Sequence, residues 1–155
     1  MKTILQKDLW SITSFLENKK YNFDKSNILT QLPEKFIDEA IEAISSWDNY
    51  TPTPLRKLNK LNDELKLNNI YYKDEDKRFN LKSFKALGGA FAVYKIASEK
   101  KNITVSTATA GNHGRSVAWG AQRLGLKCKI FISEFVSESR AEAMRNLNAE
   151  VIRVK

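Results

Sequence analysis

A chain of 155 residues with a single cysteine, Cys128, cannot form an intrachain disulfide, and it lacks the clustered cysteines of common zinc sites. Its net charge of +8 permits attraction to nucleic acid or to anionic ligands, but the lysines are scattered among acidic and amide residues. No apolar run approaches the roughly 20 residues of a membrane helix, and charges interrupt the N-terminus too early for a signal peptide. We therefore expect a cytoplasmic protein that binds neither nucleic acid nor membranes.

The first part of the chain contains one clear amphipathic helix. Residues 1–33 are polar and predict an irregular arm, with a short strand as the alternative. From Pro33 to Trp47, apolar residues recur at three- and four-residue steps, which predicts a helix. The two prolines in residues 51–54 predict a stiff, extended connector, and a short helix is expected over residues 56–66.

Strand and helix patterns alternate from residue 70 to the end. Strands are predicted over residues 70–73, 103–106, 129–132 and 150–154, and helices over residues 84–100, 113–124 and 138–147. The predicted inward faces of these helices are Leu87, Phe91 and Tyr94, then Val117, Ala121 and Leu124, then Ala141, Met144 and Leu147. This alternation predicts an α/β fold of three layers, with a largely parallel sheet and flanking helices. The last predicted strand ends one residue before the chain does, so we expect the fold to continue beyond it.

The most specific feature is the run TATAGNHG at residues 107–114, where a predicted strand breaks at glycine into a helix. Ligands of open α/β sheets bind at such carboxyl ends of strands. Gly111 and Gly114 would let a ligand approach the backbone, and Asn112 would offer donors to an anionic group. The alternative is that Asn112 or Thr109 caps the helix. His113 is the only histidine; a lone histidine is more often a packing or positioning residue than a catalytic base, and no metal site is expected because no second His or Cys lies nearby.

The second candidate is Lys85, at the start of the predicted helix over residues 84–100. Two consecutive glycines, Gly88 and Gly89, follow it and indicate close approach of another backbone or a ligand. Apolar neighbours and a helix N-terminus disfavour the ammonium form and favour the neutral amine that attacks a carbonyl. The alternative is an ordinary solvated lysine. The charged run at residues 73–78 predicts a solvated loop, or else a segment that orders the chain before Lys85, and Cys128 is predicted to be buried.

The segments KDEDKRFNLKSFKALGGAFAVYK and STATAGNHGRSVAWGAQRLG resemble fold-type II pyridoxal-phosphate enzymes. Within that group Arg78-Phe79 and the run RSVAW at residues 115–119 resemble the diaminopropionate ammonia-lyases most. The resemblance covers about residues 50–155. It implies that Lys85 holds pyridoxal 5'-phosphate as a Schiff base, that Asn112 contacts the ring's 3-oxygen, and that the turn containing Thr109, Gly111 and His113 receives the substrate carboxylate.

The resemblance also implies an organisation and an activity. Residues 1–95 would begin the large cofactor domain and residues 96–155 the small domain, in a protein that is a homodimer when full length. The activity would be β-elimination from a small amino acid, with 2,3-diaminopropionate as first candidate. Two departures stand out: Ala110 replaces the acidic residue of those lyases, as in threonine dehydratases, and the family's glycine-rich phosphate loop and the residue facing the pyridine nitrogen are not in this sequence. The alternatives are an inactive fragment or pseudoenzyme acting as a binding or assembly partner, and a basic nucleic-acid-binding domain.

Overall fold

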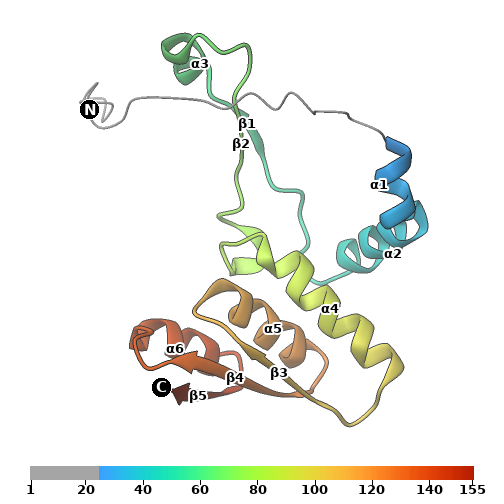
Figure 1. The fold of residues 1–155 in the computed structure, drawn as a ribbon, viewed down its shortest axis with the longest axis vertical. Coiled ribbons are helices and arrows are strands. Elements are labelled where there is room, and N and C mark those ends of the chain that lie inside the picture. The colour runs from blue at the N-terminus through green and yellow to red at the C-terminus, as the bar shows by residue number, and fades with distance from the viewer. Residues whose placement is uncertain (1–24) are drawn as a thin grey trace. The chain divides into compact units, whose positions relative to one another are not determined.

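The computed structural model describes residues 25–155, and the larger of its two compact units runs from Lys35 to Lys155. In chain order the elements are α1 (Lys25–Gln31), α2 (Glu34–Ser45), β1 (Leu55–Lys57), α3 (Asn59–Leu65), β2 (Tyr71–Lys73), the 3-10 turn η1 (Arg78–Asn80), α4 (Lys85–Glu99), β3 (Thr104–Ala108), α5 (Asn112–Arg123), β4 (Lys127–Ser133), α6 (Glu138–Arg145) and β5 (Ala149–Val154) (Figure 1). None of the helices in this range is long and apolar enough to cross a lipid bilayer.

Two helices lie near the start of the described residues. The predicted irregular arm is wrong for residues 25–31, which form α1; the part of that prediction on residues 1–24 lies outside the described residues. The sequence of this segment shows no helical period of apolar residues. In the structure, helical backbone hydrogen bonds define it, such as the bond of 2.8 Å from the N–H of Leu32 to the carbonyl oxygen of Ile28. The predicted helix after Pro33 is confirmed as α2, and residues 51–54 belong to no helix or strand, so their extended conformation stays a prediction.

Strands β1 and β2 form a two-stranded antiparallel ribbon, in which Leu55 pairs with Lys73. The helix predicted from residue 56 therefore starts three residues later, at Asn59, and the strand expected over residues 70–73 does not join the parallel sheet. After α3 the chain returns alongside β1, so that β2 pairs with β1 in the antiparallel direction and not with β3. Asn62 fixes the return, since its side-chain oxygen accepts a bond from the N–H of Ile70 at 2.7 Å.

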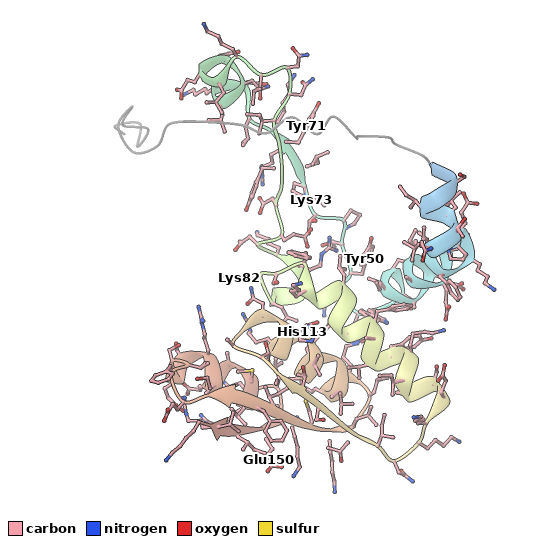
Figure 2. The ribbon with its side chains drawn as sticks, in the orientation of Figure 1. Tyr50, Tyr71, Lys73, Lys82, His113 and Glu150 are labelled. Atoms are coloured by element: carbon pink, nitrogen blue, oxygen red, sulfur yellow. The ribbon has the colours of Figure 1, made fainter. Side chains whose placement is uncertain are left out.

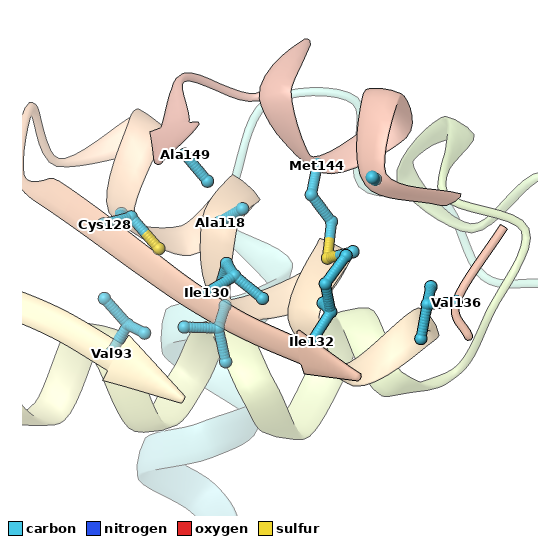
Figure 3. Packing of buried hydrophobic residues seen from close by; sticks show 11 residues of the cluster. Val93, Ala118, Cys128, Ile130, Ile132, Val136, Met144 and Ala149 are labelled. Atoms are coloured by element: carbon cyan, nitrogen blue, oxygen red, sulfur yellow. The ribbon is translucent and has the colours of Figure 1, made fainter. Parts of the chain in front are cut away.

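The second sheet is parallel, in the order β3-β4-β5. Residues alternate along β4, so that Cys128, Ile130 and Ile132 are buried while Lys127 and Lys129 are exposed. Figure 3 shows the buried side chains packed among residues of α5 and α6, which places both helices against the same face of the sheet. The predicted α/β class with a parallel sheet is confirmed, and so is the burial of Cys128.

The predicted inward face of α4 is only partly correct. Leu87 and Phe91 are half-buried, but Tyr94 is exposed. The fully buried face consists of smaller side chains, Ala86, Gly89, Ala90 and Val93. Because α4 packs directly against α5, small residues line the contact and the larger ones lie at its side. The predicted domain boundary between residues 95 and 96 falls within α4 and stays a prediction.

The inward faces of the two later helices are largely correct. In α5, Val117 and Ala121 are buried, but Leu124 lies at the C-cap and is exposed. In α6, Ala141 and Met144 are completely buried, and a half-buried Leu147 packs against the same core. The 3.6-residue period therefore identifies the buried face until the helix ends.

Candidate functional site

The two candidate segments begin two helices that pack side by side. The Ser116 hydroxyl donates a hydrogen bond of 2.5 Å to the carbonyl oxygen of Lys85, and further along both helices Gly120 lies against Ala90. These contacts advance in the same direction on α4 and α5, so the helices are parallel (Figure 1). Lys85 and Asn112 are their first residues and therefore lie at the same end of the pair.

The start of α4 is fixed by a local turn. The N–H of Lys85 donates to the hydroxyl of buried Ser83 at 3.2 Å, and the N–H of Ala86 donates to the Ser83 carbonyl. The Lys85 side chain itself is exposed, with its Nζ 5.1 Å from the centroid of the Phe84 ring. The prediction that apolar side chains surround Lys85 is wrong for the described residues, because Lys85 is exposed and Phe84 beside it is itself 61% exposed.

The two glycines after Lys85 have different roles. A Cβ at Gly89 would overlap the hydroxyl of Ser116 and would lie 3.7 Å from Nδ1 of His113. The predicted close approach is therefore made at Gly89 by helix α5, with His113 beside α4 (Figure 2). A Cβ at Gly88 would meet no atom within 4 Å, so free space lies one turn after Lys85.

The start of α5 carries no side-chain cap. Gly111 is the N-cap residue, and Thr109 Oγ1 accepts only a long bond of 3.4 Å from the N–H of Gly111. The alternative that Asn112 or Thr109 caps the helix is therefore wrong, and the Asn112 and His113 side chains are exposed. The expectation for Gly114 is also wrong: a Cβ there would overlap Thr109 and lie 2.7 Å from the sulfur of Met144, so this glycine serves packing.

A cavity of about 500 Å³ opens at the N-terminus of α5, where α6 lies beside it. Its lining residues are Ala110, Gly111, Asn112, Arg115, Ser139, Arg140 and Ala143. The Nε atom of Arg115 is buried and has no hydrogen-bond partner among the described residues, and an Arg140 guanidinium N–H donates to the Ala110 carbonyl at 3.4 Å. Two cations and a helix N-terminus give this cavity the chemistry of an anion receptor.

The structure brings together only part of the predicted site. Gly111 and Asn112 line the cavity, whereas Lys85 is not among its lining residues. Arg140 was missed because it lies in α6, 30 residues beyond Ala110, and nothing local marks it. No three His, Cys, Asp or Glu side chains within residues 25–155 gather to hold a metal ion.

The charged run before Lys85 orders its loop rather than being wholly solvated. Arg78 is only 6% exposed; its Nε donates to Glu75 at 2.8 Å and its two other nitrogens donate to Thr53 Oγ1 at 2.8 Å and to the Thr51 carbonyl at 3.2 Å. These bonds hold the pKa of Glu75 below its ordinary value, and Glu75 in turn raises the pKa of Arg78. The alternative interpretation of the run is therefore confirmed for Glu75 and Arg78, while Lys77 stays exposed.

The loop between Arg78 and Lys85 has an unusual backbone. Three non-glycine residues have positive φ: Phe79 at 46°, Asn80 at 58° and Lys82 at 53°. Such conformations cost of order 1–3 kcal/mol each and persist only where neighbouring contacts impose them. Phe79 supplies such a contact, because its ring packs on Trp119 with centroids 4.6 Å apart.

Comparison with known proteins places these features in a family. Residues 47–155 match the family described as pyridoxal-phosphate dependent enzymes. The chain belongs to this family. It is 35% identical over 154 residues to the diaminopropionate ammonia-lyase of Escherichia coli K12, covering 88% of this chain and 38% of that protein. It is 37% identical over 131 residues to the biosynthetic L-threonine dehydratase of Haemophilus influenzae, covering 81% of this chain and 25% of that protein.

Solved structures agree with the sequence comparison. The Escherichia coli diaminopropionate ammonia-lyase in complex with an aminoacrylate-PLP azomethine reaction intermediate matches with a TM-score of 0.76 at 34% identity, covering 90% of this chain and 38% of that one. A pyridoxal 5'-phosphate-dependent aspartate racemase matches at 27% identity with a TM-score of 0.68, covering 77% and 36%. The chain thus spans less than half the length of each of these relatives.

The residues at the helix starts fit such a cofactor. An aldehyde needs an accessible primary amine, and Lys85 is exposed at the first position of α4. A phenolic oxygen needs a hydrogen-bond donor, and the amide of Asn112 is exposed at the first position of the parallel helix α5. The free space above Gly88 leaves room beside Lys85, and the donor set therefore suits the aldehyde side of pyridoxal phosphate.

Proposed function

We propose that this chain carries the lysine and the substrate-binding turn of a pyridoxal-phosphate-dependent ammonia-lyase. The observation that supports this most is the shared end of α4 and α5, which brings an exposed Lys85 and an exposed Asn112 to one end of the helix pair. When bound, the cofactor supplies an aldehyde that joins to amines and a ring that accepts electrons. Lys85 would hold it covalently, and Asn112 would donate to its ring oxygen.

The α5 cavity supports an amino-acid substrate. The turn containing Thr109, Gly111 and His113 would receive the substrate carboxylate. Of these three residues only Gly111 lines the cavity, where the positive end of α5 and the cation of Arg115 favour an anion. No carboxylate side chain lines this cavity, and the resemblance to the lyases implies that Ala110 stands where they carry an acidic residue. Lys85 does not line the cavity but begins the helix that runs parallel to α5, and we assign the removal of the α-proton to its amine, once the substrate's own amine has displaced it.

The favoured substrate is 2,3-diaminopropionate. Its β-amino group leaves as ammonia with loss of the α-proton, and hydrolysis of the released aminoacrylate by one water gives pyruvate and a second ammonia. Sequence identity to diaminopropionate ammonia-lyases over 88% of this chain supports this choice. The similarity to threonine dehydratases makes L-threonine the alternative substrate. The two are distinguished by product, because threonine has a hydroxyl at the β-carbon and would yield a four-carbon keto acid.

The full-length protein provides the test, with visible absorbance after addition of pyridoxal phosphate and ammonia release from each substrate. Lys85→Ala should lose the absorbance of the lysine-bound cofactor and nearly all turnover. Lys100→Ala, at the exposed opposite end of α4, is the matched control and should behave as the parent protein. Unchanged absorbance and turnover in Lys85→Ala would refute the assignment.

A further inference from the structure

We propose that Arg78 is a positioning residue that determines where α4 begins and hence where the Lys85 amine is presented. This inference rests on the proposed function, in which Lys85 carries the cofactor. Arg78 itself is buried and seven residues away from Lys85 in sequence, and we assign it no contact with cofactor or substrate.

Arg78 joins three points of the chain through its guanidinium. Besides the Nε bond to Glu75, one nitrogen donates to both Thr53 Oγ1 at 2.8 Å and Glu75 Oε1 at 3.0 Å, and the other reaches the Thr51 carbonyl. The Thr53 hydroxyl also donates to Glu75, which closes a ring of hydrogen bonds. An ammonium group cannot reproduce this planar set of donors, so lysine is not an equivalent residue here.

The residues between Arg78 and Lys85 connect the fixed position of Arg78 to the start of α4. The Leu81 N–H donates to the Arg78 carbonyl at 2.8 Å, and Leu81 and Ser83 are both buried. Ser83 then accepts the N–H of Lys85. Fixed residues therefore follow one another every two or three positions, from Arg78 through Leu81 and Ser83 to Lys85, the first residue of α4.

Because Phe79, Asn80 and Lys82 have positive φ, the conformation of residues 78–85 depends on the contacts that hold this segment. Asn80 and Lys82 are exposed, and left-handed backbone is retained only where surrounding contacts impose it. If Arg78 loses its bonds, the segment gains freedom to adopt the ordinary φ region, and the start of α4 shifts. The Ser116 bond to the Lys85 carbonyl holds the helix from the other side, so we expect loss of positioning rather than loss of the helix.

Arg56 offers a matched control in the same region. It also bonds a carboxylate, Asp74, at 2.8 Å, but its side chain is 59% exposed and Asp74 directly precedes Glu75. Exposed ion pairs contribute little to stability. Arg56→Lys therefore changes the same chemical group without changing the anchor of the loop.

The experiment compares Arg78→Lys with Arg56→Lys in the full-length protein. The first readout is backbone hydrogen exchange in the absence of cofactor. In Arg78→Lys the amides of Leu81, Lys85 and Ala86 should exchange faster by about tenfold, the effect of one lost charge-assisted bond, while those of β4 stay unchanged. The second readout is the rate at which borohydride traps pyridoxal phosphate on Lys85, located by peptide mass spectrometry, which should fall. The third is turnover, where kcat should fall more than KM rises.

Several outcomes would overturn the inference. These are exchange at residues 81–86 equal to that of Arg56→Lys, exchange raised equally throughout α4 and β4, or trapping at Lys85 at the parent rate. Thr53→Val removes the hydroxyl that accepts from Arg78 and donates to Glu75 but leaves Arg78 and its Nε bond to Glu75 in place. It serves as the milder variant if Arg78→Lys does not fold, and it should raise exchange at the same three amides. If the parent protein itself traps no cofactor at Lys85, the proposed function fails, whereas the exchange measurement still decides the role of Arg78.

Discussion

A methyl group added at Gly120 tests how closely α4 and α5 pack. The new Cβ would lie 2.9 Å from the Cα of Ala90, 3.1 Å from its Cβ and 3.3 Å from its carbonyl oxygen. Because these are atoms of the helix backbone and its first carbon, no change of rotamer relieves the overlap, and the helices must move apart. Overpacking costs about 1–3 kcal/mol, and we take about 2–3 kcal/mol here because the overlap is with backbone atoms that cannot rotate away; alanine recovers about 1 kcal/mol through its higher helix propensity. We expect Gly120→Ala to lower the free energy of unfolding by about 1–2 kcal/mol.

Gly88→Ala provides the control for the same chemical change in the neighbouring helix. No atom lies within 4 Å of the Cβ position at Gly88, which is exposed on α4. This variant should gain about 0.4–1 kcal/mol, because alanine restricts the unfolded chain. Urea unfolding of both variants at 25 °C measures the difference between their free energies of unfolding, which we expect to be about 2 kcal/mol. In thermal unfolding, each kcal/mol corresponds to a shift of roughly 2–4 °C in the melting temperature. A Gly120→Ala protein as stable as the parent, or more so, would show that the helices do not touch at Ala90.

Two further predictions concern titrating groups. Burial raises the pKa of the Cys128 thiol from 9.0 to about 11, so the folded protein holds this proton more tightly than the unfolded chain. Between these values the parent should lose stability relative to Cys128→Ala by about 1.4 kcal/mol per pH unit, and parallel pH profiles for the two proteins would contradict this. The pKa of Glu75 is lowered by Arg78, so its contribution is present above 4.5 and is lost as the pH falls through the folded value. Glu75→Gln should therefore be less stable by about 1–3 kcal/mol at pH 7, with a difference that narrows on acidification; a constant difference down to pH 3 would refute the role of the charge.

Periodic patterns in the sequence predicted the parallel half of the fold well. Residues 103–154 contain three strands separated by helices with apolar residues at three- and four-residue steps, and β3, α5, β4, α6 and β5 follow in that order. The pattern holds because both the strands and the helices bury one face against a common core, so that burial repeats with the period of each element. Helix α1 lacked such a period and was not predicted.

The larger errors came where partners are distant in sequence. The inward face of α4 was assigned to Leu87, Phe91 and Tyr94 because large apolar residues usually face the core. The contact with α5 instead buries glycine and alanine, and no local pattern reveals which helix lies opposite. Likewise, Lys85 was expected among apolar side chains on the evidence of its neighbours in sequence, yet Phe84 is exposed beside it.

The order of residue types alone determined that this chain alternates strand and helix, that its turn at residues 107–114 ends a strand in glycine, and that a lysine begins the preceding helix. Each of these is a property of adjacent residues, and local backbone preferences suffice to express it. Only the tertiary structure decided that α4 and α5 are parallel and place Lys85 and Asn112 at one end, that Arg115 and Arg140 line one cavity, and that Arg78 joins Glu75 to Thr53. These are contacts between residues as many as 31 positions apart, and which distant groups meet depends on how whole helices and strands pack.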